Sequence, residues 1–286
     1  MNEGTKASFI SLKAFYVRRA LRILPPFWLY LITLALLGLA GVINVPLSQI
    51  GISTLFLSNF ATEELPWVLC HTWSLSNEEQ FYLIYPLLFL QLGFTSKPRI
   101  LLMGLSMTVI LSVGLSILGV DSWANYLSNI NFLMTGCAGA LYWDRLSPIC
   151  RSLSVKSWLM VLVSLIACVG LLPNSIDIYL KTLFYPSMIG LVVLGTPNQN
   201  TKFKAFFQNS LLAYLGKISY SVYLWQQLAT APYPILSPWY TVLFVLCTWI
   251  FAICSYEYFE RPLINIASRW SDVIKQRVGV SPGFTK

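Results

Sequence analysis

The chain has 286 residues, of which 56% are hydrophobic and only 10% are charged, and its mean hydropathy is +0.66. A soluble domain carries about 25% charged residues, so this composition excludes a single water-soluble core. The net charge of +8 does not indicate a nucleic-acid partner, because basic residues of membrane proteins gather in cytoplasmic loops. The six cysteines form no CxxC pair and no metal-ligand spacing, so no metal site is expected.

Long apolar runs predict that the chain crosses a membrane about eight times. Each run is long enough to pass through a hydrocarbon layer of about 30 Å as a helix. Backbone groups in lipid must be hydrogen-bonded internally, and the runs lack the alternation of a barrel strand. The expected fold class is therefore an all-α polytopic membrane helix bundle. The expected spans are 23–43, 78–94, 99–119, 126–143, 157–173, 178–195, 209–229 and 239–256.

The placement of basic residues predicts the orientation of these spans. With the N-terminus inside, every basic residue except Lys181 falls on the cytoplasmic side, as the positive-inside rule requires. Counting 47–60 as a span would move Lys97 and Arg99 outside, so that run is expected to lie along the outer interface or to re-enter. Both ends are then cytoplasmic, in a multi-pass protein of the bacterial inner membrane. The expected division is a basic segment 1–22, a transmembrane domain 23–260 and a basic tail 261–286.

The first stretch that could carry chemistry is FYVRRALRILP, residues 15–25. On a helix Arg18 and Arg22 share a face, and Arg19 lies three residues from Arg22. Guanidinium groups bind phosphates through paired hydrogen bonds, so the three arginines could hold a nucleotide-like donor. The alternative is contact with lipid headgroups. Pro25 and Pro26 suit the first turn of the first span.

The second stretch is HTWSLSNEEQFYLIYPLL, residues 71–88, and it holds the only histidine of the chain. His71 and Glu78 could meet across two helical turns, as an imidazole oriented by a carboxylate for base catalysis. Glu79 supplies a second carboxylate at the entry to a span. The alternative interpretation is a capping box, with Ser76 as N-cap and Glu79 reaching back.

Two further stretches lie near the end of the chain. Tyr220, Tyr223 and Gln227 step by three and four residues, which places a polar stripe on one face of a span. Such a stripe either lines a cavity or joins helices by hydrogen bonds. The last stretch, around Glu260 and Arg261, is interpreted as a cap of the last span at the inner interface, with these two residues side by side.

Together the four stretches resemble the acyltransferase-3 family of membrane O-acyltransferases, whose motifs FYxRRxxRIxP, HTWSLSxEEQFYLxYPLL, GxISYSxYLWH and ExP occur here in the family's order and spacing. The resemblance covers about residues 8–266. It implies transfer of an acyl group, commonly acetyl from acetyl-CoA, to a cell-surface carbohydrate, with no tightly bound cofactor. By the same resemblance Arg18, Arg19 and Arg22 would bind the donor.

The resemblance, together with the residues above, gives the candidate site. We expect His71, Glu78 and Glu79 to be catalytic and the cavity to be lined by Trp73, Tyr82, Tyr220, Tyr223 and Gln227. Complete members of the family have ten spans, and the histidine most often held catalytic lies on the first of them. This sequence begins at the FYxRR stretch, so it is expected to be a form without the first two spans, which a partner chain could supply. Gln226 stands where many members have a histidine.

Two other functions remain open from the residues alone. The first is a membrane protein without enzymatic activity in glycan export or assembly, although the sequence shows no repeat symmetry typical of a transporter. The second is an inactive fragment of an acyltransferase. The leading hypothesis is a membrane O-acyltransferase with membrane lipid, an acyl donor and a carbohydrate acceptor as partners, and no nucleic acid.

Overall fold

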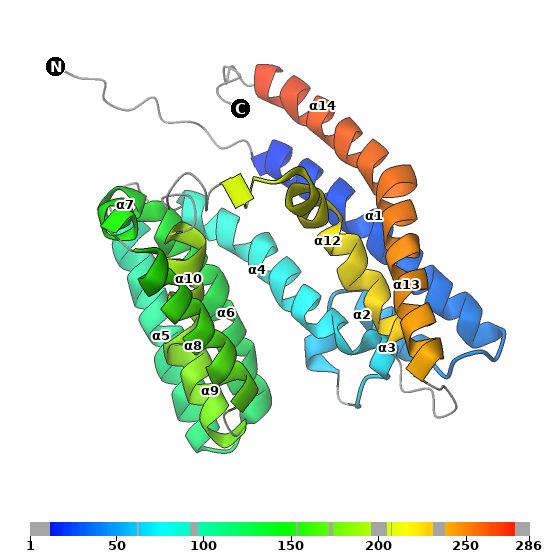
Figure 1. Ribbon diagram of the computed structural model, residues 1–286, viewed down its shortest axis with the longest axis horizontal. Helices are drawn as coiled ribbons and strands as arrows, with labels where there is room; N and C mark the ends of the chain where they lie inside the picture. Colours follow the sequence, from blue (N-terminus) through cyan, green and yellow to red (C-terminus); the bar gives the residue numbers. More distant parts are fainter. Residues whose placement is uncertain are drawn as a thin grey trace. The chain divides into compact units, whose positions relative to one another are not determined.

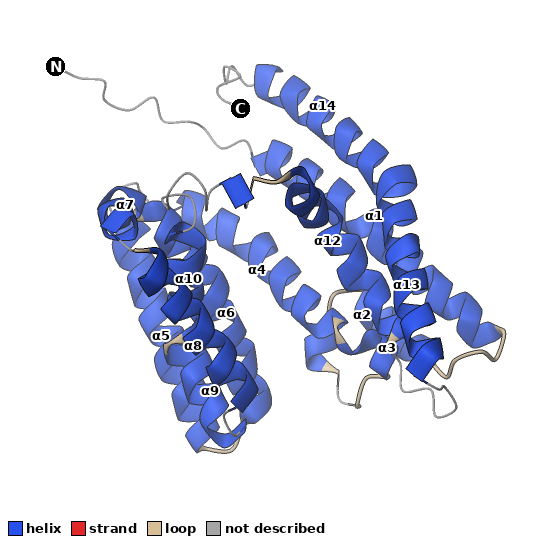
Figure 2. Ribbon diagram, viewed as in Figure 1, coloured by secondary structure: helices blue, strands red, loops and turns tan. Residues whose placement is uncertain are grey.

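The computed structural model describes residues 12–61, 63–91, 97–152, 154–171, 174–195, 205–206, 208–230 and 238–277. Every regular element within these ranges is helical (Figure 2), which confirms the all-α fold class predicted from the apolar runs. The chain forms two compact units. The first unit contains residues 1–72 and 214–286, and the second contains residues 73–213.

The first unit is built around the long N-terminal helix α1 (Leu12–Leu39), which packs along α14 (Arg261–Arg277; Figure 1). Its core holds the fully buried side chains of Phe27, Tyr30 and Leu34 from α1. The other elements of this unit are α2 (Leu47–Thr54), a 3-10 turn (Ser58–Phe60), α3 (Trp67–Cys70), most of α12 (Ser210–Ala229), α13 (Pro238–Cys254) and a π-helical turn (Ser255–Glu260).

Helix α1 begins earlier than the sequence analysis expected. Pro25 and Pro26 lie inside it, so their assignment to the first turn of the span is wrong. The residues before the prolines are good helix formers such as Arg, Ala and Leu, and this part of α1 is also supported by α14. The helix ends in a Schellman motif, in which Gly41 has a φ of 71° and the amide of Val42 donates to Leu37 at 2.9 Å.

The second unit is a bundle of helices that are mostly neighbours in the sequence. It contains helix α4 (Thr72–Gln91) except for the first residue, Thr72, which belongs to the first unit. Its apolar cluster is formed by Phe81, Leu101 and Met134. Gly104 permits a close approach there, because a Cβ at this position would lie 2.8 Å from the Cε of Met134. The remaining helices are α5 (Lys97–Ile117), α6 (Asp121–Leu141), α7 (Trp143–Ser152), α8 (Val155–Leu171), α9 (Asn174–Leu183) and α10 (Tyr185–Gly195).

Several expected spans differ from the helices observed. The span 178–195 is broken at Phe184 into α9 and α10, and Pro186, which lacks an amide hydrogen, follows the break. Helix α2 has eight residues and rises only about 12 Å, so the run 47–60 is too short to cross the membrane as a helix. Ser76 lies inside α4 rather than before it, so the capping-box interpretation is wrong.

Within the described residues, three helices are long and apolar enough to cross a membrane: Leu12–Leu39, Arg99–Ile117 and Val242–Ile274. The last of these joins α13, the π-helical turn and most of α14 into one continuous helix. A bent pair of helices, Trp143–Cys150 with Val155–Cys168, gives a fourth candidate if it is counted as one span. The number of eight spans and the cytoplasmic position of both ends stay predictions.

Candidate functional site

Parts of all four sequence stretches meet in the first unit, at two levels along α1. The first level lies around Arg18 and Arg22. The second lies around Tyr30, eight residues or about 12 Å further along the helix. Residues of α12 reach both levels, because Tyr220 contacts α1 at Ile23 and Tyr223 contacts His71.

At the first level the arginines of α1 meet the C-terminal helix. The guanidinium of Arg18 donates a hydrogen bond to the hydroxyl of Ser271 on α14. Arg22 is exposed and interacts electrostatically with Glu260. Arg19 lies half-buried on the same helix. The tail therefore packs against the basic stretch, which the sequence analysis had treated as a separate segment.

Glu260 is the functional candidate that sequence reasoning missed. Its side chain is only 2% exposed, and its Oε1 accepts hydrogen bonds from Ser221 at 2.5 Å and from Ser255 at 3.0 Å. Glu260 ends the π-helical turn, and such turns occur often at functional sites. Its neighbour in the sequence, Arg261, forms an ion pair with Glu257 at 2.5 Å, one helical turn away. Glu260 is thus directed inward, to α12 and Arg22.

At the second level His71 lies in an aromatic cluster. It follows α3, outside the apolar spans, and its ring makes edge-on contacts with Tyr30 and Tyr223 at centroid distances of 5.5 and 5.0 Å. The two tyrosines also hold the backbone here: Tyr30 donates to the carbonyl of Val68 at 2.7 Å, and Tyr223 donates to the carbonyl of His71. Burial lowers the pKa of His71 from 6.5 to about 4, so the imidazole is neutral at pH 7.

Hydroxyl groups support the turn that carries His71. Thr72 Oγ1 lies 2.8 Å from the hydroxyl of Ser58 and 2.7 Å from the carbonyl oxygen of Leu69. The Ser58 hydroxyl in turn donates to Ser53 at 3.0 Å. These buried hydroxyls satisfy one another, which fixes the start of α4 at a point where polar groups without partners would be costly.

The polar stripe of α12 joins helices. Tyr220 donates to the carbonyl of Ile23 at 3.0 Å, and Tyr223 binds the turn at His71 as described. Gln227 accepts a hydrogen bond from Thr230 at 3.0 Å within its own region. The contacts of both tyrosines fit the packing alternative. Their role in lining a cavity stays a prediction.

The remaining predicted site residues belong to the second unit. Glu78 is exposed and Glu79 half-buried on α4. Trp73 is 38% exposed, and the ammonium of Lys181 lies 5.8 Å from the centroid of its ring. Tyr82 packs edge-on against Phe81 at 5.6 Å. The proposed meeting of His71 with Glu78 involves residues of two different units and stays a prediction.

The side chain of Asn77, in the same stretch, has an environment that the sequence does not reveal. The side chain is buried, 3% exposed, and its amide has no hydrogen-bond partner within the described part of the chain. A buried amide without a partner is unfavourable by about 1–3 kcal/mol, so such groups call for an explanation in function.

The chain is similar in sequence to known acyltransferases. Residues 5–257 match a family model described as an acyltransferase domain. The chain is 25% identical to the peptidoglycan O-acetyltransferase OatA of Listeria monocytogenes, over 92% of this chain and 48% of that protein. It is 29% identical to the O-acetyltransferase OatA of Staphylococcus aureus (strain NCTC 8325), over 73% of this chain and 37% of that protein. No solved structure matches the chain significantly.

The chain thus spans half or less of the length of these curated relatives. The family match, in contrast, covers most of its 286 residues, including Arg18, Arg22 and Tyr30 of α1 and the turn at His71. This chain belongs to the acyltransferase-3 family of membrane proteins.

Proposed function

We propose that this chain is a membrane O-acyltransferase that moves an acetyl group from acetyl-CoA to a carbohydrate of the bacterial cell envelope. The observation that carries the proposal is the convergence of Arg22, Ser221 and Glu260, which come from three separate family stretches. Two relatives are named as O-acetyltransferases, and one of them as acting on peptidoglycan, so peptidoglycan is the acceptor that we expect.

Arg18, Arg19 and Arg22 would bind the phosphates of the donor. Guanidinium groups form strong, paired hydrogen bonds to phosphate oxygens, and the exposed side chain of Arg22 is accessible to an anion. Glu260 would act as a positioning residue that holds Arg22. Its carboxyl group is itself held by Ser221 and Ser255, so the acidic side chain that interacts electrostatically with Arg22 is fixed in place before the donor arrives.

The reaction joins a hydroxyl oxygen of the acceptor to the acetyl carbonyl carbon. The carbon–sulfur bond of acetyl-CoA breaks, the acceptor hydroxyl gives its proton to a base, and the leaving thiolate takes up a proton to become free CoA. We propose His71, Glu78 and Glu79 for the proton transfers. His71 is in the neutral form needed to accept a proton at pH 7, although its low pKa makes it a weak base.

The cellular setting completes the proposal. The protein would cross the bacterial cytoplasmic membrane several times, with both ends and the donor site in the cytoplasm. The acceptor would bind at the outer side, near the start of α4. Membrane lipid surrounds the spans, and a partner chain could contribute further spans to the bundle.

The proposal is tested by acetyl transfer in membranes that contain the full chain, with labelled acetyl-CoA and isolated cell-envelope glycan. The wild type should label the glycan. Arg22→Ala should lower the transfer about tenfold or more, because a hydrogen bond to a charged group contributes about 1.5–3 kcal/mol. The matched control is Arg269→Ala, which removes an exposed arginine of α14.

Equal transfer by Arg22→Ala and Arg269→Ala would contradict the donor site. A complete lack of label, with normal membrane insertion, would contradict the enzymatic proposal. It would favour a role in glycan export or assembly.

A further inference from the structure

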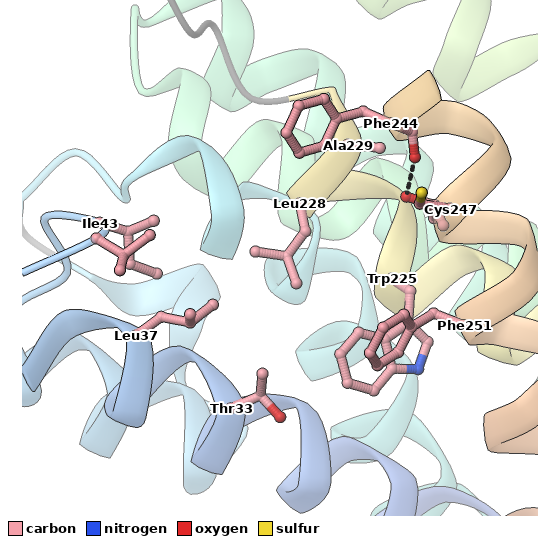
Figure 3. A pocket seen from close by; sticks show the side chains of 11 residues that line it. Thr33, Leu37, Ile43, Trp225, Leu228, Ala229, Phe244, Cys247 and Phe251 are labelled. Atoms are coloured by element: carbon pink, nitrogen blue, oxygen red, sulfur yellow. Dashed lines mark hydrogen bonds between the residues drawn. The ribbon is translucent and has the colours of Figure 1, made fainter. Parts of the chain in front are cut away.

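The first unit contains an apolar pocket that the proposed reaction does not use. The pocket has a volume of about 350 Å³ and lies among residues of α1, α12 and α13 and the segment after α1 (Figure 3). Its lining residues are Thr33, Leu37, Val42, Ile43, Trp225, Leu228, Ala229, Phe244, Cys247, Thr248 and Phe251.

The two hydroxyl groups of this lining are already engaged in their own helices. The hydroxyl of Thr33 donates to the carbonyl of Leu29 at 2.8 Å, and that of Thr248 donates to the carbonyl of Phe244 at 3.0 Å. Both threonines therefore have no hydroxyl hydrogen left for a ligand. The indole nitrogen of Trp225 is buried and has no hydrogen-bond partner in the described ranges. The lining thus favours hydrocarbon and offers a polar ligand little compensation for lost hydration.

The pocket is much larger than an acetyl group requires. An apolar cavity of about 150 Å³ is sufficient to hold benzene. This pocket is more than twice as large. It therefore has room for a chain of several methylene groups.

Trp225 connects the pocket to the His71 cluster. Its ring lines the pocket and also contacts Tyr30 edge-on at a centroid distance of 5.5 Å, and Tyr30 in turn contacts the ring of His71. On the other side Trp225 packs against Phe251 at 5.4 Å. The rings of Trp225 and Tyr30 would thus lie between an occupant of the pocket and the ring of His71.

The surroundings of α13 supply a source of such chains. Phe244, Cys247 and Phe251 line the pocket and are also partly exposed on a helix that is apolar enough to cross a membrane. In lipid, these exposed parts contact hydrocarbon chains rather than water. A chain could therefore enter the pocket from the membrane without crossing an aqueous phase.

We infer that this pocket binds the hydrocarbon chain of a lipidic ligand, packed against the rings of Trp225 and Phe251. The chain belongs either to a membrane phospholipid or to a long-chain acyl thioester. Binding of the second kind rests on the proposed function and would extend its donor range beyond acetyl. Binding of the first kind is independent of that function.

The inference is tested with the full chain in membranes and two photoreactive probes that carry a diazirine at the chain end. The probes are a phosphatidylglycerol and a decanoyl-CoA. After irradiation, adducts are mapped by mass spectrometry. Adducts at Leu228, Phe244 and Cys247 should exceed those on the exposed face of α5, at Met103 and Met107, which reports ordinary contact with lipid.

A matched pair of variants on α12 sharpens the test. Ala229→Phe fills the pocket, whereas Ala213→Phe makes the same change at an exposed position of the same helix. Pocket adducts should fall about tenfold in Ala229→Phe, a loss of ~1.4 kcal/mol of binding, and stay unchanged in Ala213→Phe. Adducts on α5 serve as the internal reference in both variants.

The outcomes distinguish a phospholipid from an acyl thioester as the ligand, and they distinguish failure of this inference from failure of the proposed function. Labelling of the pocket by the phospholipid alone identifies a lipid tail, and labelling by decanoyl-CoA identifies an acyl chain. Equal adduct density in the pocket and on α5 of the wild type would overturn the inference, whatever the folding of the variants. Because the measurement records binding, a chain that labels in the pocket but transfers no acetyl would contradict only the proposed function.

Discussion

The two units of this chain are held together in different ways. In the first, contacts join segments far apart in the sequence, such as Arg18 with Ser271 and Tyr220 with Ile23, and they enclose the polar side chains of His71 and Glu260. In the second, neighbouring helices pack through an apolar cluster and small residues such as Gly104. Both units bury polar side chains, since Asn77 and Asn131 of the second are buried as well, so the difference lies in how far apart in the sequence the contacting segments are. The positions of His71 and Glu260 depend on the long-range contacts of the first unit.

The largest expected effect concerns the protonation of His71. Its pKa is lowered by burial from 6.5 to about 4 in the folded protein, so protonation favours the unfolded state. The contribution of the neutral His71 to the free energy of unfolding is fully present above pH 6.5. It is lost as the pH falls toward 4, which lowers the free energy of unfolding by up to about 3 kcal/mol. Unfolding of the purified protein across this pH range should show the loss.

The control for this prediction is His71→Phe, which keeps an aromatic ring and removes the titrating group. Its unfolding should depend less on pH between 6.5 and 4 than that of the wild type. The same pH dependence in both proteins would show that other groups are responsible.

The next prediction compares the loss of stability on replacing two glutamates of the same π-helical turn. Glu260→Ala removes the acceptor of the Ser221 and Ser255 hydroxyls and should destabilise the protein by about 2–3 kcal/mol. Glu257→Ala removes an ion pair with Arg261 and a hydrogen bond with Tyr214, both at the surface, and should change the stability less. Thermal unfolding in detergent measures both. Equal destabilisation would mean that the buried network does not hold the first unit together.

The smallest effect is expected in the second unit. In Gly104→Ala the new Cβ displaces only the flexible end of Met134, and the gain in helix propensity of about 0.5–1 kcal/mol offsets the strain. The stability should stay within about 0.5 kcal/mol of the wild type. A large loss in the same unfolding assay would show that the packing of this unit is as sensitive as the polar network of the first.

Much of the fold followed from the sequence, because apolar runs and breaks are local signals. The all-α class and the exclusion of 47–60 as a span depended only on composition, length and charge. The break before α10 had a signal in Pro186 that was not used. The sequence analysis placed the start of α1 too late, because the first turns of this helix are supported by packing on α14, which is a tertiary contact. It also missed that α4 begins at Thr72, so that Ser76 lies inside the helix.

The candidate site was harder to predict for a similar reason. Glu260 was recognised as part of a motif, but nothing in the sequence indicated that it ends a π-helical turn and contacts Ser221. Tyr30 and Trp225 looked like ordinary apolar residues of their spans. Their contacts with the His71 cluster join parts of the chain that are distant in the sequence, and one sequence without an alignment contains no record of such proximity.

Acetyl transfer by Glu260→Gln and Glu257→Gln tests the central claim most directly. In Glu260→Gln the amide oxygen of the new side chain would still accept from the two serines, so the fold should persist while the electrostatic interaction with Arg22 is lost. We predict that Glu260→Gln transfers much less acetyl to the glycan than the wild type, and that Glu257→Gln transfers as much. Undiminished transfer by Glu260→Gln would contradict the assignment of the site to this level of α1.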